Sequence, residues 1–171
     1  GEKIFDRLSA CGIPQVPIWI RENTRICTTI ACNGDTTELV EPSPTLADSE
    51  NDDFVQTLND HWDSTQYVAL CGTFPQGFDP KMFDSLDFNG KQIFVDAIDG
   101  IDGLLAKGVE LLKINMLEYC KLLEHLSIPQ VKSSPQFWKM TATAVLERLP
   151  IKNLVVTDED SPVRAFRLVE K

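Results

Sequence analysis

The stretch LKINMLE at residues 112–118 brings a lysine, an amide and a carboxylate close together in the chain, at Lys113, Asn115 and Glu118. Its first half has a strand-like pattern, and the residues after it are typical of a helix. A lysine ammonium pairs with phosphate as a compact charge. An amide and a carboxylate near a helix start can hold Mg²⁺ through water, because this ion keeps several of its waters in proteins. The spacing therefore suits phosphate and metal chemistry.

The same two polar side chains also have a purely structural interpretation. Asn115 is a good N-cap residue for the following helix, and Glu118, three positions later, completes a capping box. Taken alone, this stretch favours the capping interpretation, and both interpretations stay open at this point.

Three other polar or glycine-rich segments directly follow apolar runs, as LKINMLE does. CGTFPQG (71–77) follows YVAL, DAIDG (96–100) follows QIFV, and TDED (157–160) follows NLVV. In open parallel sheets, ligands gather at the carboxyl ends of the strands. We therefore expect these segments to share one rim with residues 112–118. The candidate residues in them are Gly72, Thr73, Asp96 and Thr157.

Each of these segments has a simpler alternative. The glycines and proline of CGTFPQG are common in loops that only turn the chain, and taken alone this segment favours that interpretation. Small residues would otherwise leave backbone N–H groups and the Thr73 hydroxyl free to face an anion or a sugar. Asp96 could orient a ligand hydroxyl or cap the segment that follows it.

The elements that must position these residues alternate between strands and helices. Apolar runs predict buried parallel strands, helical spacing predicts helices between them, and VRAFRLV (163–169) predicts an antiparallel edge strand. This order indicates an α/β fold with a Rossmann-like, mostly parallel sheet flanked by helices. The predicted strands are 67–72, 92–96, 109–114 and 153–157, and the predicted helices are 2–11, a helix containing Phe54, Leu58 and Trp62, 116–126 and 134–149.

A β-hairpin precedes this alternating part. Residues 25–32 and 36–40 alternate in polarity around NGD, whose Asn-Gly pair is a hairpin-turn signal. We expect one partial domain over 1–171, with a β lid lobe at 15–44 and an α/β core at 45–171. Arg25 lies on the polar face of the predicted strand. A guanidinium can grip a phosphate with two hydrogen bonds, although a solvated strand arginine is commoner.

The bulk composition excludes several classes of function. A net charge of −10 argues against binding a nucleic-acid backbone and against docking on anionic membranes. The five cysteines are widely spread, without zinc spacing, which favours a reducing, cytoplasmic setting. No GxxxxGK[ST], HExxH or GxSxG motif occurs, so a Walker-type NTPase, a zincin and a serine hydrolase lack support. No GxGxxG follows a strand, so a Rossmann-type dehydrogenase ranks a distant third, behind the two hypotheses given below.

Taken in order, the segments resemble the middle of a PfkB-type (ribokinase-like) carbohydrate kinase, in the phosphofructokinase and tagatose-6-phosphate kinase branch. ENTRICTTI…TTELVEPSP is similar to that branch's Thr-Arg pair, hairpin and TE…EPGP strand. CGTFPQG resembles SGSLPPG, FVDAIDG resembles LDTSG, LLKINMLE resembles IKPNxxE, and NLVVTDED resembles VVVTLGxxG. The resemblance covers nearly the whole chain and predicts a ribokinase-like fold, incomplete at both ends.

The resemblance also implies roles. Arg25 would hold the phosphate of a sugar phosphate, with Gly72, Thr73 and Asp96 near the sugar. The motif that handles ATP phosphates and Mg²⁺ would be supplied by Lys113, Asn115, Glu118 and Thr157, with Asn115 and Glu118 reaching the metal through water. The hairpin would be a lid that pairs with a second copy in a homodimer.

The departures from the family pattern matter as much. The family's GxGD, whose aspartate is the catalytic base, is absent, as is the upstream glycine-rich sugar-binding segment. Cys27 and Ile114 replace an asparagine and a proline, and Glu159 and Pro162 stand where glycines are usual, which puts adenine-nucleotide binding in doubt. We expect a piece of an ATP-dependent sugar or sugar-phosphate kinase that is inactive by itself. The alternative is a catalytically silent, kinase-like binding or scaffold protein.

Overall fold

The computed structural model describes residues 1–97, 99–132, 134–158 and 161–169. The chain forms two compact units. One consists of Gly1–Asp63 with Phe74–Asp79, and the other of Ser64–Thr73 with Pro80–Lys171. The predicted boundary between a lid lobe and a core at residues 44 and 45 stays a prediction.

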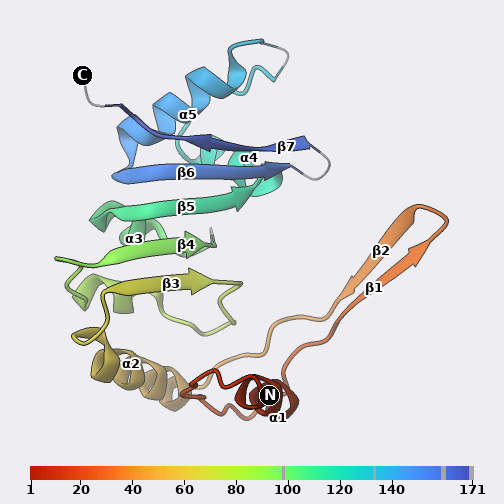
Figure 1. The fold of residues 1–171 in the computed structure, drawn as a ribbon, viewed down its shortest axis with the longest axis vertical. Helices are drawn as coiled ribbons and strands as arrows, with labels where there is room; N and C mark the ends of the chain where they lie inside the picture. The colour runs from red at the N-terminus through yellow and green to blue at the C-terminus, as the bar shows by residue number, and fades with distance from the viewer. Residues whose placement is uncertain (98, 133, 159–160, 170–171) are drawn as a thin grey trace. The chain divides into compact units, whose positions relative to one another are not determined.

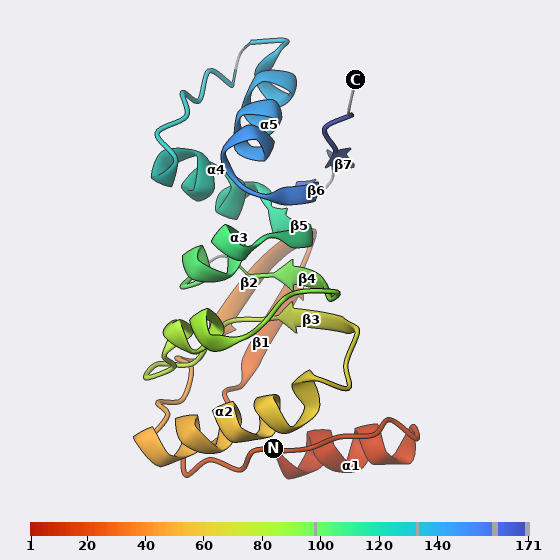
Figure 2. The same cartoon turned by 90° about the vertical axis from the view of Figure 1, so that its left-hand side faces the viewer.

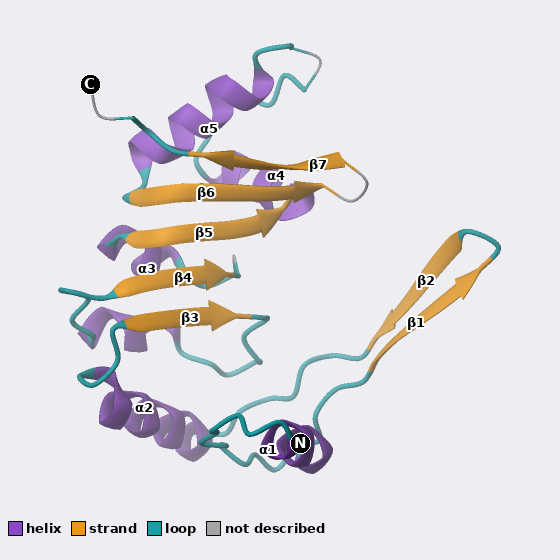
Figure 3. Cartoon of the chain, viewed as in Figure 1, coloured by secondary structure: helices purple, strands orange, loops and turns teal. Residues whose placement is uncertain are grey.

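The second unit is built on a five-stranded sheet of order β3-β4-β5-β6-β7 (Figure 1). The first four strands pair in parallel and β7 pairs antiparallel with β6, as the sequence pattern predicted. Figure 3 shows these strands as one layer. Their bounds are β3 Tyr67–Cys71, β4 Gln92–Asp96, β5 Val109–Asn115, β6 Ile151–Asp158 and β7 Ser161–Phe166.

Helices join the parallel strands, and Figure 2 shows α3, α4 and α5 on one face of the sheet. Alternate strand residues point into this face, where Val95, Leu112, Ile114 and Val156 are at most 1% exposed. Burying such side chains is the main source of stability in the unit. The helices are η1 Pro80–Ser85, α3 Asp102–Lys107, α4 Met116–His125 and α5 Phe137–Arg148.

Two predicted elements of this unit had wrong bounds. The edge strand begins at Ser161 and ends at Phe166, rather than spanning 163–169, because its pairing with β6 begins at Ser161, opposite Asp158, and ends at Phe166, opposite Leu154. Helix α5 begins at Phe137 rather than at Ser134. The Ser134 hydroxyl accepts a hydrogen bond from the Gln136 backbone N–H at 3.2 Å, so Ser134 belongs to the turn before the helix.

The first unit contains α1 (Glu2–Ala10), the hairpin β1 (Cys27–Cys32) and β2 (Asp35–Val40), and α2 (Asp48–Trp62). The Asn-Gly turn is confirmed: Asn33 and Gly34 have φ values of 51° and 90°, the positive pair that a type I′ hairpin requires. Every residue of both strands is exposed. A lone two-stranded hairpin is only marginally stable in water.

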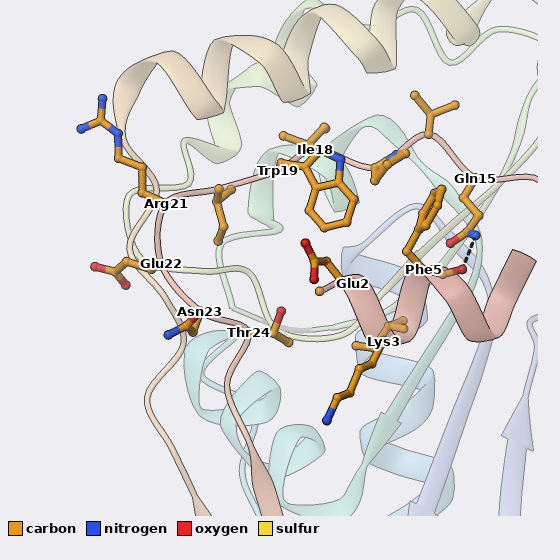
Figure 4. Close-up of a pocket in the computed structure, with 15 residues that line it drawn as sticks. Glu2, Lys3, Phe5, Gln15, Ile18, Trp19, Arg21, Glu22, Asn23 and Thr24 are labelled. Atoms are coloured by element: carbon orange, nitrogen blue, oxygen red, sulfur yellow. Dashed lines mark hydrogen bonds between the residues drawn. The ribbon is translucent and has the colours of Figure 1, made fainter.

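Helix α1 is held by the segment that follows it in the same unit. The Gln15 amide donates to the Phe5 carbonyl and to the Ser9 hydroxyl, both at 2.8 Å, and the Phe5 and Trp19 rings lie 5.8 Å apart. Figure 4 shows Phe5, Gln15 and Trp19 at a cavity, which has a volume of about 790 Å³ and is lined by residues 1–5 and 15–24. In the part of the chain that the structure describes, no helix is long and apolar enough to cross a bilayer.

Candidate functional site

The strand ends of the second unit meet along one rim of the sheet, as expected. Cys71 pairs with Asp96 and Val95 with Leu112, so Lys113 lies next to Asp96 in the register. Asn115 pairs with Thr157 on the other side. The register therefore places Asp96, Lys113, Asn115 and Thr157 at this rim. The other predicted site residues of this unit directly follow strand ends of the same rim: Gly72 and Thr73 after β3, and Glu118 in the first turn of α4 after β5.

Gly72 turns the chain at the end of β3. Its backbone N–H donates to the Asp96 carbonyl at 3.1 Å, so the loop start is attached to the next strand. Its φ of 95° strongly favours glycine, and no atom lies within 4 Å of the place that a Cβ would occupy. Gly72 and Thr73 are exposed, so this side of the rim is open to a ligand.

Lys113 and Asp96 form an ion pair. The Lys113 ammonium lies 3.1 and 3.0 Å from the two carboxylate oxygens of Asp96, and the side chains are 39% and 44% exposed. Sequence reasoning gave these residues separate roles, because nothing in the sequence links positions on neighbouring strands to a specific contact. The pair fixes the ammonium at the rim while leaving it accessible to an anion.

Asn115 and Glu118 form the capping box at the start of α4. The Asn115 side-chain oxygen accepts from the Glu118 backbone N–H at 2.9 Å, and one Glu118 carboxylate oxygen accepts from the Asn115 backbone N–H at 2.8 Å. The structural interpretation of LKINMLE is therefore confirmed. It does not exclude a ligand role, since the other Glu118 oxygen makes no hydrogen bond within the described residues.

The donor set limits how a metal could be held here. No group of three or more His, Cys, Asp and Glu side chains that could bind a metal occurs within 1–97, 99–132, 134–158 and 161–169. One free oxygen of Glu118 fits a water-mediated contact to Mg²⁺, which prefers oxygen ligands and keeps its waters. The predicted metal role of Asn115 and Glu118 thus fits only through water.

Thr157 is half-buried on β6, opposite Asn115. Of the two residues that replace family glycines, Pro162 lies in β7, and Glu159 falls outside the described residues.

Arg25 lies in the first unit and was misplaced by the sequence analysis. It precedes β1 rather than lying in mid-strand, because the strand pairing begins only at Cys27. Its guanidinium donates to the Ser43 hydroxyl at 2.9 Å. Arg25 is half-buried and lines a cavity of about 530 Å³ formed by residues 21–25 and 41–44. Its predicted role as a phosphate ligand stays a prediction.

Glu50 is a candidate that the sequence analysis did not single out. It is only 7% exposed, and its two carboxylate oxygens accept backbone N–H bonds from Arg21 at 2.6 Å and Ala47 at 2.8 Å. The hydrogen bond from Ala47, then that from Arg21, hold the pKa of Glu50 below its usual value, against the opposing effect of burial. The acidic first turn of a predicted helix was the available signal, but it does not reveal the partner at Arg21.

The fold is similar to that of phosphofructokinase-2 from Escherichia coli. Its complex with substrates and products matches with a TM-score of 0.78 and 15% identity, over 99% of this chain and 56% of that chain. The tetrameric inhibited form of the same enzyme matches with a TM-score of 0.76 and 16% identity, over 97% of this chain and 55% of that chain. A phosphofructokinase candidate from Staphylococcus aureus matches with a TM-score of 0.66 and 17% identity, over 96% of this chain and 53% of that chain.

The chain therefore spans little more than half the length of these structures. No protein-family model and no curated protein sequence matches it. At these identities the likeness establishes the fold: a mostly parallel sheet with helices, plus an antiparallel hairpin, as in the PfkB-type phosphofructokinase structures. The predicted ribokinase-like fold class is confirmed.

Proposed function

We propose that this chain is the central part of a PfkB-type carbohydrate kinase, which transfers a phosphoryl group from ATP to a hydroxyl of a sugar or sugar phosphate. The observation that carries the proposal is the rim, where the strand register gathers a cation, carboxylates, an amide and hydroxyls at one edge of the sheet. The structural neighbours support the sugar-phosphate class, since one is phosphofructokinase-2 in complex with fructose-6-phosphate.

In this proposal the chain supplies placed charge and orientation. Phosphoryl transfer depends mainly on positioning and on electrostatic stabilisation of the phosphoryl oxygens. Lys113 would pair with nucleotide phosphates, and Gly72, Thr73 and Asp96 would border the sugar. Mg²⁺, when bound, would neutralise phosphate charge, with Glu118 and Asn115 reaching it through water. Thr157 would complete the phosphate side of the rim.

Two further roles belong to the first unit in this proposal. Arg25 would hold the substrate's own phosphate. The hairpin would pair with a second copy of the chain, because Ile30, Leu39 and Val40 are 49%, 57% and 58% exposed on strands that nothing in their own unit covers. We also propose a cytoplasmic location, where ATP is available and thiols stay reduced, because all five cysteines are unpaired.

The chain itself has no GxGD segment to provide a base and an anion hole. Because proton removal and anion stabilisation each contribute about a hundredfold or more to such rates, we expect no measurable turnover from the 171 residues by themselves.

A catalytically silent binding or scaffold protein is the second candidate. It is favoured by the observation that the groups proposed for nucleotide binding already have partners: Lys113 pairs with Asp96, and Asn115 and Glu118 cap α4.

Calorimetry separates the two candidates. The kinase proposal expects both MgATP and fructose 6-phosphate to bind the chain, and the complete gene product to phosphorylate a fructose phosphate from ATP. If the chain binds fructose 6-phosphate but not MgATP, and the folded complete gene product shows no turnover, the binding protein is favoured instead.

A further inference from the structure

The hairpin of the first unit stands on a neck formed by two legs, residues 21–26 and 41–45. Carboxylates of one leg bond backbone N–H groups of the other. Glu22 accepts from Thr45 at 2.7 Å, and Glu41 accepts from Ile26 at 2.8 Å. The Glu41 backbone N–H also donates to the Ile26 carbonyl at 3.2 Å. The two legs are thus tied in both directions below the regular β pairing.

Glu50 adds a buried third tie. It belongs to the first turn of α2, which follows the second leg, and it bonds the backbone N–H of Arg21, where the first leg begins. Its other oxygen accepts from the backbone N–H of Ala47 at 2.8 Å, so the start of the first leg and the chain just after the second leg bond the same carboxylate. A buried carboxylate costs free energy unless it is hydrogen-bonded. Both Glu50 oxygens are satisfied here, and the lowered pKa keeps the group ionised.

This use of the acids leaves Arg25 available. Glu22 and Glu41 of the neck and Glu50 of α2 all accept bonds from backbone N–H groups, and within the described residues none of the three bonds Arg25. The Arg25 guanidinium donates one hydrogen bond, to Ser43 on the opposite leg. A guanidinium has five N–H donors, and in the described residues the other four have no protein partner. The cavity beside it, about 530 Å³, is lined by both legs.

We propose that Glu50 is a positioning residue for Arg25. By holding the two legs of the neck in place, Glu50 keeps the Arg25 guanidinium directed at an anion in this cavity. The anion would be the phosphate group of a sugar phosphate, and this part of the inference rests on the proposed function. The neck itself is independent of that function, since its bonds are intramolecular.

The test compares three forms of the full chain: wild type, Glu50→Gln, and Asp52→Asn as the matched control. Asp52 is an exposed carboxylate on the same helix, and it accepts no hydrogen bond from the other described residues. In Glu50→Gln we expect amide hydrogen exchange at Ile26 and Thr45 to rise about tenfold or more, because a charged hydrogen bond is lost from the neck. Exchange at Leu112, in the other unit, should not change, and Asp52→Asn should match the wild type throughout.

Titration with fructose 6-phosphate gives the second readout. Affinity should fall about tenfold or more in Glu50→Gln and in Arg25→Ala, since either change removes a charge-assisted bond or its orientation. The double variant should lose no more than Arg25→Ala alone, which a merely structural role of Glu50 would not produce. If Glu50→Gln does not fold, Glu50→Asp, which keeps the charge but shortens the reach, is tested in its place.

Unchanged exchange at Ile26 and Thr45, or losses that add in the double variant, would overturn the inference. If the wild type binds no fructose 6-phosphate, the proposed function fails, and the exchange at the neck alone decides whether Glu50 holds Arg25's leg in place.

Discussion

Replacing Lys113 with methionine separates a structural from a ligand-binding role at the rim. Methionine keeps most of the apolar stem of lysine but removes its charge. The ion pair with Asp96 has good distances, 3.0 and 3.1 Å, but its side chains are 39% and 44% exposed. Pairs as exposed as this contribute about 0–1 kcal/mol to stability. The free energy of unfolding should therefore fall by less than about 1 kcal/mol.

Binding should respond more strongly than stability. If the ammonium bonds a nucleotide phosphate, its loss removes a charge-assisted hydrogen bond worth about 1.5–3 kcal/mol. Since about 1.4 kcal/mol corresponds to a tenfold change in Kd, the affinity for MgATP should fall roughly 10- to 100-fold.

Lys152→Met is the matched control. Lys152 also pairs with a carboxylate on a neighbouring strand, Glu110 at 2.8 Å, but it lies at the start of β6, away from the carboxyl-end rim. Calorimetry with MgATP and urea unfolding should be run on both variants. An MgATP affinity that is the same in Lys113→Met and in the wild type would refute the role given to Lys113. So would an equal loss in Lys152→Met.

Three further predictions concern single contacts. Asn115→Ala removes the N-cap of α4 and should lower the free energy of unfolding by about 1 kcal/mol in urea; an unchanged midpoint would contradict the capping geometry. Burial raises the pKa of Tyr119 from the ordinary tyrosine value of 10.0 to about 12, although its hydrogen bond to Thr141 opposes this. The contribution of neutral, buried Tyr119 to the free energy of unfolding is therefore complete below pH 10.0 and lost as pH rises toward 12. Ultraviolet titration in a Tyr67→Phe background follows the ionisation of Tyr119, and ionisation at pH 10.0 would refute the prediction. For Glu50, whose pKa is lowered, its two bonds to the Arg21 and Ala47 N–H groups should be complete above pH 4.5 and lost only as pH falls further, so protection of the Arg21 amide from exchange that declines already above pH 4.5 would be inconsistent.

Local signals in the sequence predicted most of the fold. The apolar runs of β3 to β6 and the Asn-Gly turn depend only on neighbouring residues, and each lies where it was expected. The strand order also placed the polar strand ends on one rim, because parallel strands share the direction of their carboxyl ends.

What failed depends on contacts that are distant in the sequence. The alternation around Arg25 extended the predicted strand too far, because it could not show that the Glu41 side chain takes the Ile26 backbone N–H. The pairing of Lys113 with Asp96 and the bond from Arg21 to Glu50 span 17 and 29 positions, and no periodic pattern encodes either.

Amide chemical shifts during titration with MgATP test most directly whether the rim of the sheet binds phosphate-bearing ligands. If the rim binds the nucleotide, we expect concentrated shifts at Gly72, Lys113 and Thr157, with little change at Tyr67 and Gln92, which lie at the opposite ends of the strands, where β3 and β4 begin. No saturable shift at the three rim positions, or equal shifts at both ends of the strands, would contradict binding at the rim.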